Sequence, residues 1–230
     1  MEDRNRMEVF LNSLEPPYPE PLIRLEADAR ARRIPIIRRP TMSLLRYLVL
    51  TRKPVEILEV GTAIGFSALF MNTYQPGSGT VYSIEKMEER YREAQQHVAE
   101  AGRQDRIFLE HGDAAESLER LITENRAFDF AFMDAAKGQY PAFLPAMEAL
   151  LKPGGLLVTD NVLQEESLLE SKYIIERRDR TIHERMRSYL YTLKHSSAWE
   201  TLILPEGDGV ALSVRTEVRR IPGGSMGEDR

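Results

Sequence analysis

The sequence contains no cysteine among its 230 residues. This absence excludes disulfide bonds, thiolate nucleophiles and cysteine metal sites. No apolar stretch approaches the roughly 18 consecutive residues that a membrane-spanning helix needs. The first six residues, Met1 to Arg6, also lack the apolar centre of a secretory signal. We therefore expect a cytoplasmic protein without a membrane segment.

Charge of either sign is not strongly in excess, since the formal net charge is −5. A weakly acidic chain argues against bulk, non-specific binding of nucleic acid. Two segments nevertheless concentrate positive charge: residues 24–39 hold six arginines against two carboxylates, and residues 172–187 hold six basic residues against three carboxylates. Such clusters can bind phosphates, and they can equally be solvated helix faces with local ion pairs. The sequence leaves both interpretations open.

Hydrophobic residues at 42% and charged residues at 29% are ordinary for a globular protein. We expect one domain over residues 1–215 and a flexible tail over 216–230. Residues 1–53 form a helical preface, with helices predicted near 1–14, 20–33 and 41–52, and Thr41 is the predicted N-cap of the third. Strand-like runs then alternate with helical patterns, which is typical of parallel βαβ units. These runs lie near residues 55–60, 80–84, 106–110, 128–133 and 155–159.

The last third of the chain has a different pattern. A long charged helix is predicted over about 166–195, followed by two strands at 199–204 and 209–214. The short turn Pro205-Glu206-Gly207-Asp208 joins these strands, so they must be antiparallel. The predicted fold is therefore α/β, a mostly parallel seven-stranded sheet with an antiparallel edge hairpin.

Acidic residues follow the first three predicted strands, where ligands bind in open α/β sheets. Glu59 precedes the glycine loop Gly61-Thr62-Ala63-Ile64-Gly65, Glu85 ends the second strand, and Asp113 follows the third. The loop lacks the G-x-G-x-x-G spacing of dinucleotide binders, and Glu59 would repel a pyrophosphate. The ordered acids instead suit an adenosine that carries a positive sulfonium, with Glu85 accepting from the ribose hydroxyls. A nicotinamide dehydrogenase is the disfavoured alternative.

Two further strand ends carry oxygen ligands for a divalent cation. Asp134 follows the run 128–133, and Asp160 and Asn161 follow the run 155–159. Carboxylate and amide oxygens are the ligands that Mg²⁺ prefers. Lys137 lies three residues after Asp134, and a neighbouring cation disfavours the protonated amine, which makes Lys137 a candidate general base.

The sequence resembles the class I S-adenosylmethionine-dependent methyltransferases. Among them it is most similar to the cation-dependent catechol and caffeoyl-CoA O-methyltransferase family. The resemblance covers about residues 5–215. It rests on the segments Glu59-Val60-Gly61-Thr62-Ala63-Ile64-Gly65-Phe66-Ser67, Glu85, Gly112-Asp113-Ala114, Asp134-Ala135-Ala136-Lys137-Gly138-Gln139-Tyr140 and Asp160-Asn161. The segments Ile34-Pro35-Ile36, 135–140 and 205–209 are also similar to the bacterial tRNA 5-hydroxyuridine methyltransferases. The loop at Gln164-Glu165-Glu166-Ser167 departs from those relatives beside the expected substrate entrance.

The resemblance implies a Rossmann-like fold, a cytoplasmic homodimer and a tRNA anticodon stem-loop as substrate. It implies S-adenosylmethionine contacts at Met42, Ser67, Glu85, Asp113, Ala114 and Asp134. Glu59 and Gly61, before and in the glycine loop, complete the predicted cofactor site. It implies Mg²⁺ bound by Asp134, Asp160 and Asn161, with Asp134 and Lys137 catalytic. A cation with two open positions favours an acceptor with two adjacent oxygens, a property that catechols share with 5-hydroxyuracil. The predicted reaction is methylation of wobble 5-hydroxyuridine to 5-methoxyuridine. The alternatives are methylation of a small catechol-like phenol and a non-catalytic RNA-binding module.

Overall fold

Seven strands form one sheet in the computed structural model, which describes residues 2–163 and 180–217. The strand order is β3-β2-β1-β4-β5-β7-β6. The first five strands are mutually parallel, and β7 pairs antiparallel with both β5 and β6. The bounds are β1 Glu56–Val60, β2 Thr80–Glu85, β3 Ile107–His111, β4 Phe128–Met133, β5 Leu151–Thr159, β6 Trp199–Leu204 and β7 Val210–Arg215. The predicted fold class, with its antiparallel edge hairpin, is confirmed.

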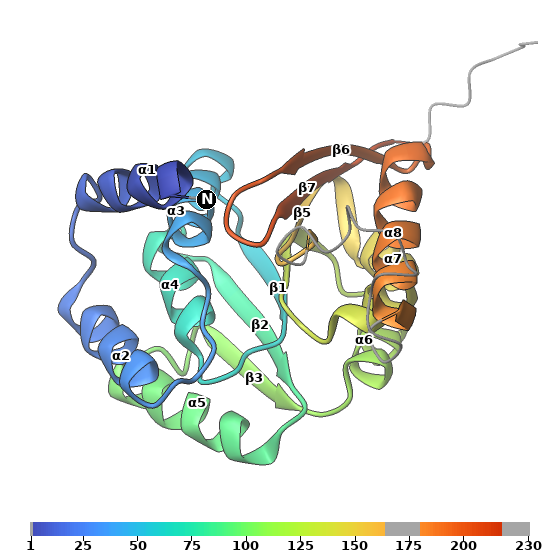
Figure 1. Ribbon diagram of the computed structural model, residues 1–230. Coiled ribbons are helices and arrows are strands. Elements are labelled where there is room, and N and C mark those ends of the chain that lie inside the picture. Colours follow the sequence, from blue (N-terminus) through green and yellow to red (C-terminus); the bar gives the residue numbers. More distant parts are fainter. Residues whose placement is uncertain (1, 164–179, 218–230) are drawn as a thin grey trace, which may run out of the picture.

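Helices cover both faces of the sheet (Figure 1). On one face lie α2 (Glu20–Ala31), α3 (Arg39–Arg52), α4 (Phe66–Tyr74) and α5 (Glu88–Glu100), with α1 (Glu2–Ser13) beside α3. On the other lie α6 (Ala114–Thr123), α7 (Tyr140–Leu150) and α8 (Arg180–His195). Within the described residues no helix has the length and apolarity to cross a membrane.

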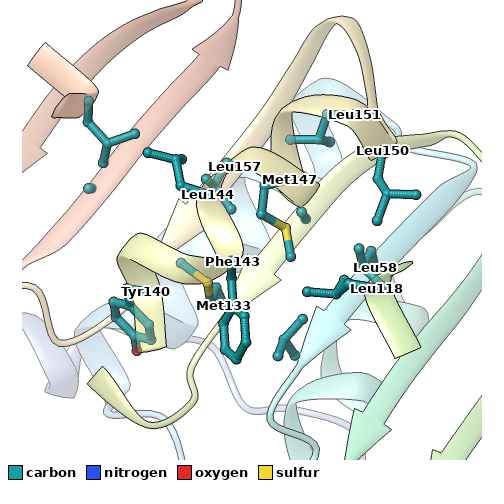
Figure 2. Close-up of a cluster of buried hydrophobic side chains, with 14 of the residues drawn as sticks. Leu58, Leu118, Met133, Tyr140, Phe143, Leu144, Met147, Leu150, Leu151 and Leu157 are labelled. Carbon is teal, nitrogen blue, oxygen red and sulfur yellow. The ribbon is translucent and has the colours of Figure 1, made fainter. Parts of the chain in front are cut away.

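Each face of the parallel strands is buried, as expected for a sheet covered by crossover helices. Successive residues of β1 show this, because Ile57 packs into the core under α3 and α4 while Leu58 packs into the core under α6 and α7. Figure 2 shows the second core, in which α7 lies on the strands through the side chains of Phe143, Leu144, Met147 and Leu150. Both cores hold the carboxyl ends of the parallel strands in place, and these ends carry the predicted site residues.

The start of α3 corrects one prediction. The helix begins at Arg39, one turn earlier than expected, and Arg38 is its N-cap residue without a side-chain cap. Pro40 is tolerated there because the first helical N–H groups have no partner in the helix. Thr41 is therefore inside the first turn and not the N-cap, and its hydroxyl points to Asp160 instead, with 3.4 Å between the Thr41 hydroxyl and Asp160 Oδ1.

The predicted long helix at 166–195 is described only from Arg180 to His195. Its first part, the loop 164–167 and the first half of the basic segment 172–187 lie outside the described residues. The predicted tail lies outside them from residue 218 onward. Trp199 is buried at the start of β6.

Candidate active site

The strand order places the predicted site residues in a row along the carboxyl edge of the sheet. Chain connections run outward in opposite directions from β1 and β4, and the crevice at such a switch point is where open α/β sheets bind ligands. Asp113, Glu85, Glu59, Asp134 and Asp160 follow or end β3, β2, β1, β4 and β5 in that spatial order. Four strand spacings separate the two ends of this row, which gives a length of about 19 Å.

Gly61 fixes the centre of the row. Its N–H donates to Ile84 O at 3.0 Å, and its φ of +102° lies in a region that favours glycine. A Cβ at this position would lie 2.0 Å from the carbonyl oxygen of Asp134. Asp134 N in turn donates to Val60 O at 3.0 Å. The glycine therefore allows the loop after β1 to touch the backbone of the residue that ends β4.

Glu59 is a fully buried carboxyl next to that loop. One of its oxygens, Oε2, accepts from the Ser83 hydroxyl. The other oxygen, Oε1, is buried without a hydrogen-bond partner. Burial raises the pKa of Glu59 to about 7. A buried carboxyl with one unused oxygen is suited to a ligand that brings a positive charge or a donor.

Glu85 and Asp113 occupy the outer part of the row. The Glu85 carboxylate accepts from Ala63 N and Met87 N, both at 2.8 Å, which leaves further lone pairs for hydroxyl donors. Asp113 is the N-cap of α6, where it accepts from Ala115 N at 2.9 Å and pairs with Lys86 at 2.9 Å. The hydrogen bond from Lys86 holds the pKa of Asp113 below its usual value. Ala114 is the first residue of that helix.

Asp134, Asp160 and Asn161 come together at the ends of β4 and β5. Asp160 N donates to Met133 O at 3.0 Å, and Asn161 Nδ2 donates to Asp134 Oδ1 at 3.0 Å. Burial, followed by the charge of Asp134, raises the pKa of Asp160 to about 7. Burial also raises the pKa of Asp134. Asn161 has a φ of +60°, a conformation that costs a non-glycine residue energy and often marks a functional site.

Two buried contacts hold this pair of strand ends. The Tyr140 hydroxyl accepts from Ala135 N at 3.3 Å and donates to the backbone oxygen of Asp160 at 3.2 Å. Tyr140 is completely buried, so it positions the two loops and does not line the cavity. Lys137 begins the short 3-10 turn η1 (Lys137–Gln139), half-buried, and its charge acts on Asp134.

Asp134, Asp160 and Asn161 line a cavity of about 540 Å³. Its other walls are the segment 33–38 before α3, Arg30 and Asp208. Asp208 was not predicted as a site residue, because residues 205–209 were interpreted as a hairpin connection and as a segment that carries the family resemblance. Leu163 N donates to Asp208 O at 2.8 Å, which ties that hairpin to the loop after β5 and brings Asp208 to the site. Met42, a predicted cofactor contact, is fully buried near Tyr18 and is not among the cavity walls.

The described part of the chain contains no group of three or more His, Cys, Asp or Glu side chains that would hold a metal ion. The predicted set contains two carboxylates, Asp134 and Asp160, and its third member, Asn161, is an amide. Its role as a metal site stays a prediction.

With this geometry in place, comparison with known proteins identifies the family. The family model described as O-methyltransferase matches residues 20–216. The chain belongs to this O-methyltransferase family. The predicted enzyme class and the predicted catechol and caffeoyl-CoA type of relative are thereby confirmed, and the tRNA-specific branch is not.

Curated relatives and solved structures agree with this assignment. A catechol O-methyltransferase from Niastella koreensis is 29% identical over 165 residues, 69% of this chain and 72% of that protein. A caffeoyl-CoA O-methyltransferase from Eucalyptus gunnii is 28% identical over 170 residues, 70% of this chain and 66% of that protein. The O-methyltransferase TomG from Streptomyces achromogenes, solved in complex with SAM, has a TM-score of 0.81 at 25% identity and covers 94% of this chain and 100% of its own.

A further structure supports the fold alone. The O-methyltransferase from Bacillus cereus, solved with SAH, is 23% identical with a TM-score of 0.80, covering 92% of this chain and 97% of its own. The two alternatives outside this family, a nicotinamide dehydrogenase and a non-catalytic module, gain no support from any of these similarities.

Proposed function

We propose that this protein transfers a methyl group from S-adenosylmethionine to a hydroxyl of an acceptor that has two adjacent oxygens, with the help of a divalent cation. The observation that carries the proposal is the meeting of Asp134, Asp160 and Asn161 at one wall of a cavity, next to the glycine loop after β1. When bound, the cofactor supplies an electrophilic methyl group on a sulfonium, and the cation lowers the cost of ionising the acceptor hydroxyl.

The residues present fit the cofactor. Glu59, with an unused buried oxygen and a pKa raised to about 7, suits the positively charged end. Glu85 retains lone pairs for the ribose hydroxyls, and Asp113 with Ala114 lies where the adenine would end. The row of about 19 Å suits an extended adenosine with its amino-acid chain.

They also fit a divalent cation. Asp134 and Asp160 are two neighbouring carboxyls whose pKa values are both raised, so the site disfavours two negative charges unless a cation is added. Asn161 Nδ2 donates to Asp134 Oδ1, which places the amide side chain beside the two carboxyls, and the carbonyl oxygen of this amide is a third oxygen ligand for a cation. Oxygen-only donors suit Mg²⁺.

The chain's own chemistry centres on the proton of the acceptor. Lys137 lies on the turn that follows Asp134, close enough to act electrostatically on that carboxyl. We assign Lys137 as the base that removes the hydroxyl proton, with Asp134 orienting the acceptor. Tyr140 and Thr41 hold the loops that carry these groups.

For the acceptor we propose 5-hydroxyuridine at the wobble position of tRNA, which gives 5-methoxyuridine. The adjacent O4 and O5 oxygens of 5-hydroxyuracil suit the cation site. The resemblance of residues 34–36, 135–140 and 205–209 to the bacterial tRNA 5-hydroxyuridine methyltransferases supports this choice. The catechol and caffeoyl-CoA O-methyltransferases among the relatives support a second candidate, a small catechol-like phenol.

One experiment separates the two acceptors. The protein is incubated with S-adenosylmethionine, Mg²⁺ and tRNA that carries 5-hydroxyuridine, and the tRNA is digested and its nucleosides are measured by mass spectrometry. A parallel reaction contains catechol. Formation of 5-methoxyuridine supports the tRNA assignment, whereas efficient turnover of catechol without any 5-methoxyuridine excludes it.

A further inference from the structure

The arginine-rich segment 24–39 is mostly neutralised within the fold. Five of its six arginines have carboxylate partners: Arg24 with Glu20, Arg30 with Glu26, Arg32 with Asp28 and Glu93, Arg38 with Asp208, and Arg39 with Glu26. Within residues 2–163 and 180–217, no such partner is found for the sixth, Arg33. Among the described residues, Arg33 is therefore the arginine of this segment whose guanidinium is not occupied by a carboxylate.

The backbone at Arg33 is in a conformation that arginine does not favour. Helix α2 ends in a turn in which Arg33 N donates to Arg30 O at 3.1 Å and Ile34 N donates to Ala29 O at 2.8 Å. Arg33 itself has a φ of +57°, and glycine or asparagine is the usual residue in that position. The helix therefore gains nothing in its termination from an arginine.

Arg33 lies where such a charge can act on the acceptor. It is exposed and lines the same cavity as Asp134, Asp160 and Asn161. Arg30 and Arg38 also line it, but their guanidinium groups are paired with Glu26 and Asp208. An anionic group of the acceptor is therefore expected on the Arg33 side of the cavity, where the described residues leave the guanidinium without a carboxylate partner.

We propose that Arg33 binds a phosphate of the acceptor and selects a nucleotide over a neutral phenol. This inference rests on the proposed function, because it gives the acceptor of the same site. A guanidinium binds phosphate oxygens through two parallel hydrogen bonds, which gives direction as well as charge. The phosphate must lie in the cavity of about 540 Å³ that also contains the candidate metal ligands, which fits a nucleotide whose phosphate is close to the reacting ring.

The test compares Arg33→Gly with Lys53→Gly. Lys53 is a matched control, because it is also a cationic, exposed residue with positive φ, at +48°, at the end of a helix and outside the cavity wall. Glycine suits the backbone at both positions. We therefore expect the melting temperature of Arg33→Gly to be no lower than that of Lys53→Gly, so that any loss of binding is not a loss of folding.

The acceptors are 5-hydroxyuridine and its 5′-monophosphate, with caffeoyl-CoA as a second phosphate source. For the nucleotide we expect KM to rise about tenfold in Arg33→Gly, the size of one charge-assisted hydrogen bond, while Lys53→Gly keeps the wild-type value. The wild-type preference for nucleotide over nucleoside should disappear in Arg33→Gly. An unchanged preference would overturn the proposal, and an equal loss with caffeoyl-CoA would overturn selection of a nucleotide.

A binding measurement separates this inference from the proposed function. Calorimetric titration of uridine 5′-monophosphate and uridine needs no methyl transfer. If tRNA carrying 5-hydroxyuridine, catechol and the two small acceptors are all left unmethylated, the proposed function fails, and the two titrations still decide the role of Arg33. Tighter binding of the monophosphate by the wild type but not by Arg33→Gly supports the proposal, and equal binding by both proteins contradicts it.

Discussion

Replacing Gly61 by alanine tests how the fold holds the site. The new methyl group would lie 2.0 Å from the Asp134 carbonyl oxygen and 2.8 Å from its carbonyl carbon, so one of the two backbone segments must move. The φ of +102° adds strain of its own. Taking about 1–3 kcal/mol for the strain and a similar amount for the overpacking, we expect the free energy of unfolding to fall by about 2–6 kcal/mol.

Two control glycines separate these contributions. Gly102 has a φ of +62° with nothing within 4 Å of an added Cβ, and Gly77 also has free space and no positive φ. Gly102→Ala should therefore show the backbone strain alone, and Gly77→Ala should be close to neutral. Urea unfolding of the three variants measures each free energy.

Activity gives the second measurement for Gly61→Ala. A displacement of about 1 Å at the end of β4 should reduce kcat on the order of 100-fold in the folded protein, since Asp134 would move with it. If Gly61→Ala is as stable as Gly102→Ala and fully active, the glycine loop does not pack closely against the Asp134 carbonyl.

Three more predictions concern single side chains. Burial raises the pKa of Glu59 from 4.5 to about 7, so the cofactor-free protein should lose stability as pH rises from about 4.5 to 7. Glu59→Gln should make this loss smaller while weakening S-adenosylmethionine binding, and the part that remains comes from Asp134 and Asp160, whose pKa values are also raised. Lys137→Ala should lower kcat on the order of 10²–10⁴-fold with little change in KM, as measured by steady-state kinetics. Asp113→Ala should cost about 1 kcal/mol of stability at pH 7 through the lost cap on Ala115, and less in acid, because the pKa of Asp113 is lowered in the fold.

Each of these has an outcome that contradicts it. If the thermal stability of Glu59→Gln depends on pH as that of the wild type does, the titration of the Glu59 carboxyl does not affect stability. An unchanged kcat in Lys137→Ala would remove the lysine from proton transfer. A stability of Asp113→Ala that equals the wild type at every pH would mean that the cap and the Lys86 ion pair contribute nothing.

The sheet and the acids at its edge could be predicted because they depend on local pattern. Apolar runs ending in Glu85, Asp134 and Asp160 specify both a buried strand and the place where it ends, and the parallel arrangement then gathers their carboxyl ends. The helical residues between them follow from the same alternation.

Residues that reach the site from distant elements could not be predicted in this way. Thr41 resembles a helix cap and Asp208 resembles a turn residue, and both descriptions are local. Their positions depend on the packing of α3 and of the β6–β7 turn against the loop after β5. The arginine cluster shows the same limit, since its charges are mostly cancelled by ion pairs such as Arg32 with Glu93, 61 positions apart in the sequence.

The central claim is that Asp134, Asp160 and Asn161 form the cation site of the reaction. The most direct test is the rate of methyl transfer from S-adenosylmethionine as a function of Mg²⁺ concentration, in the wild type and in Asn161→Ala. We expect no transfer in the presence of a chelator, and a Mg²⁺ requirement that rises at least tenfold in the variant as one of three ligands is lost. Full activity in the chelator, or the same Mg²⁺ dependence in both proteins, would contradict the claim.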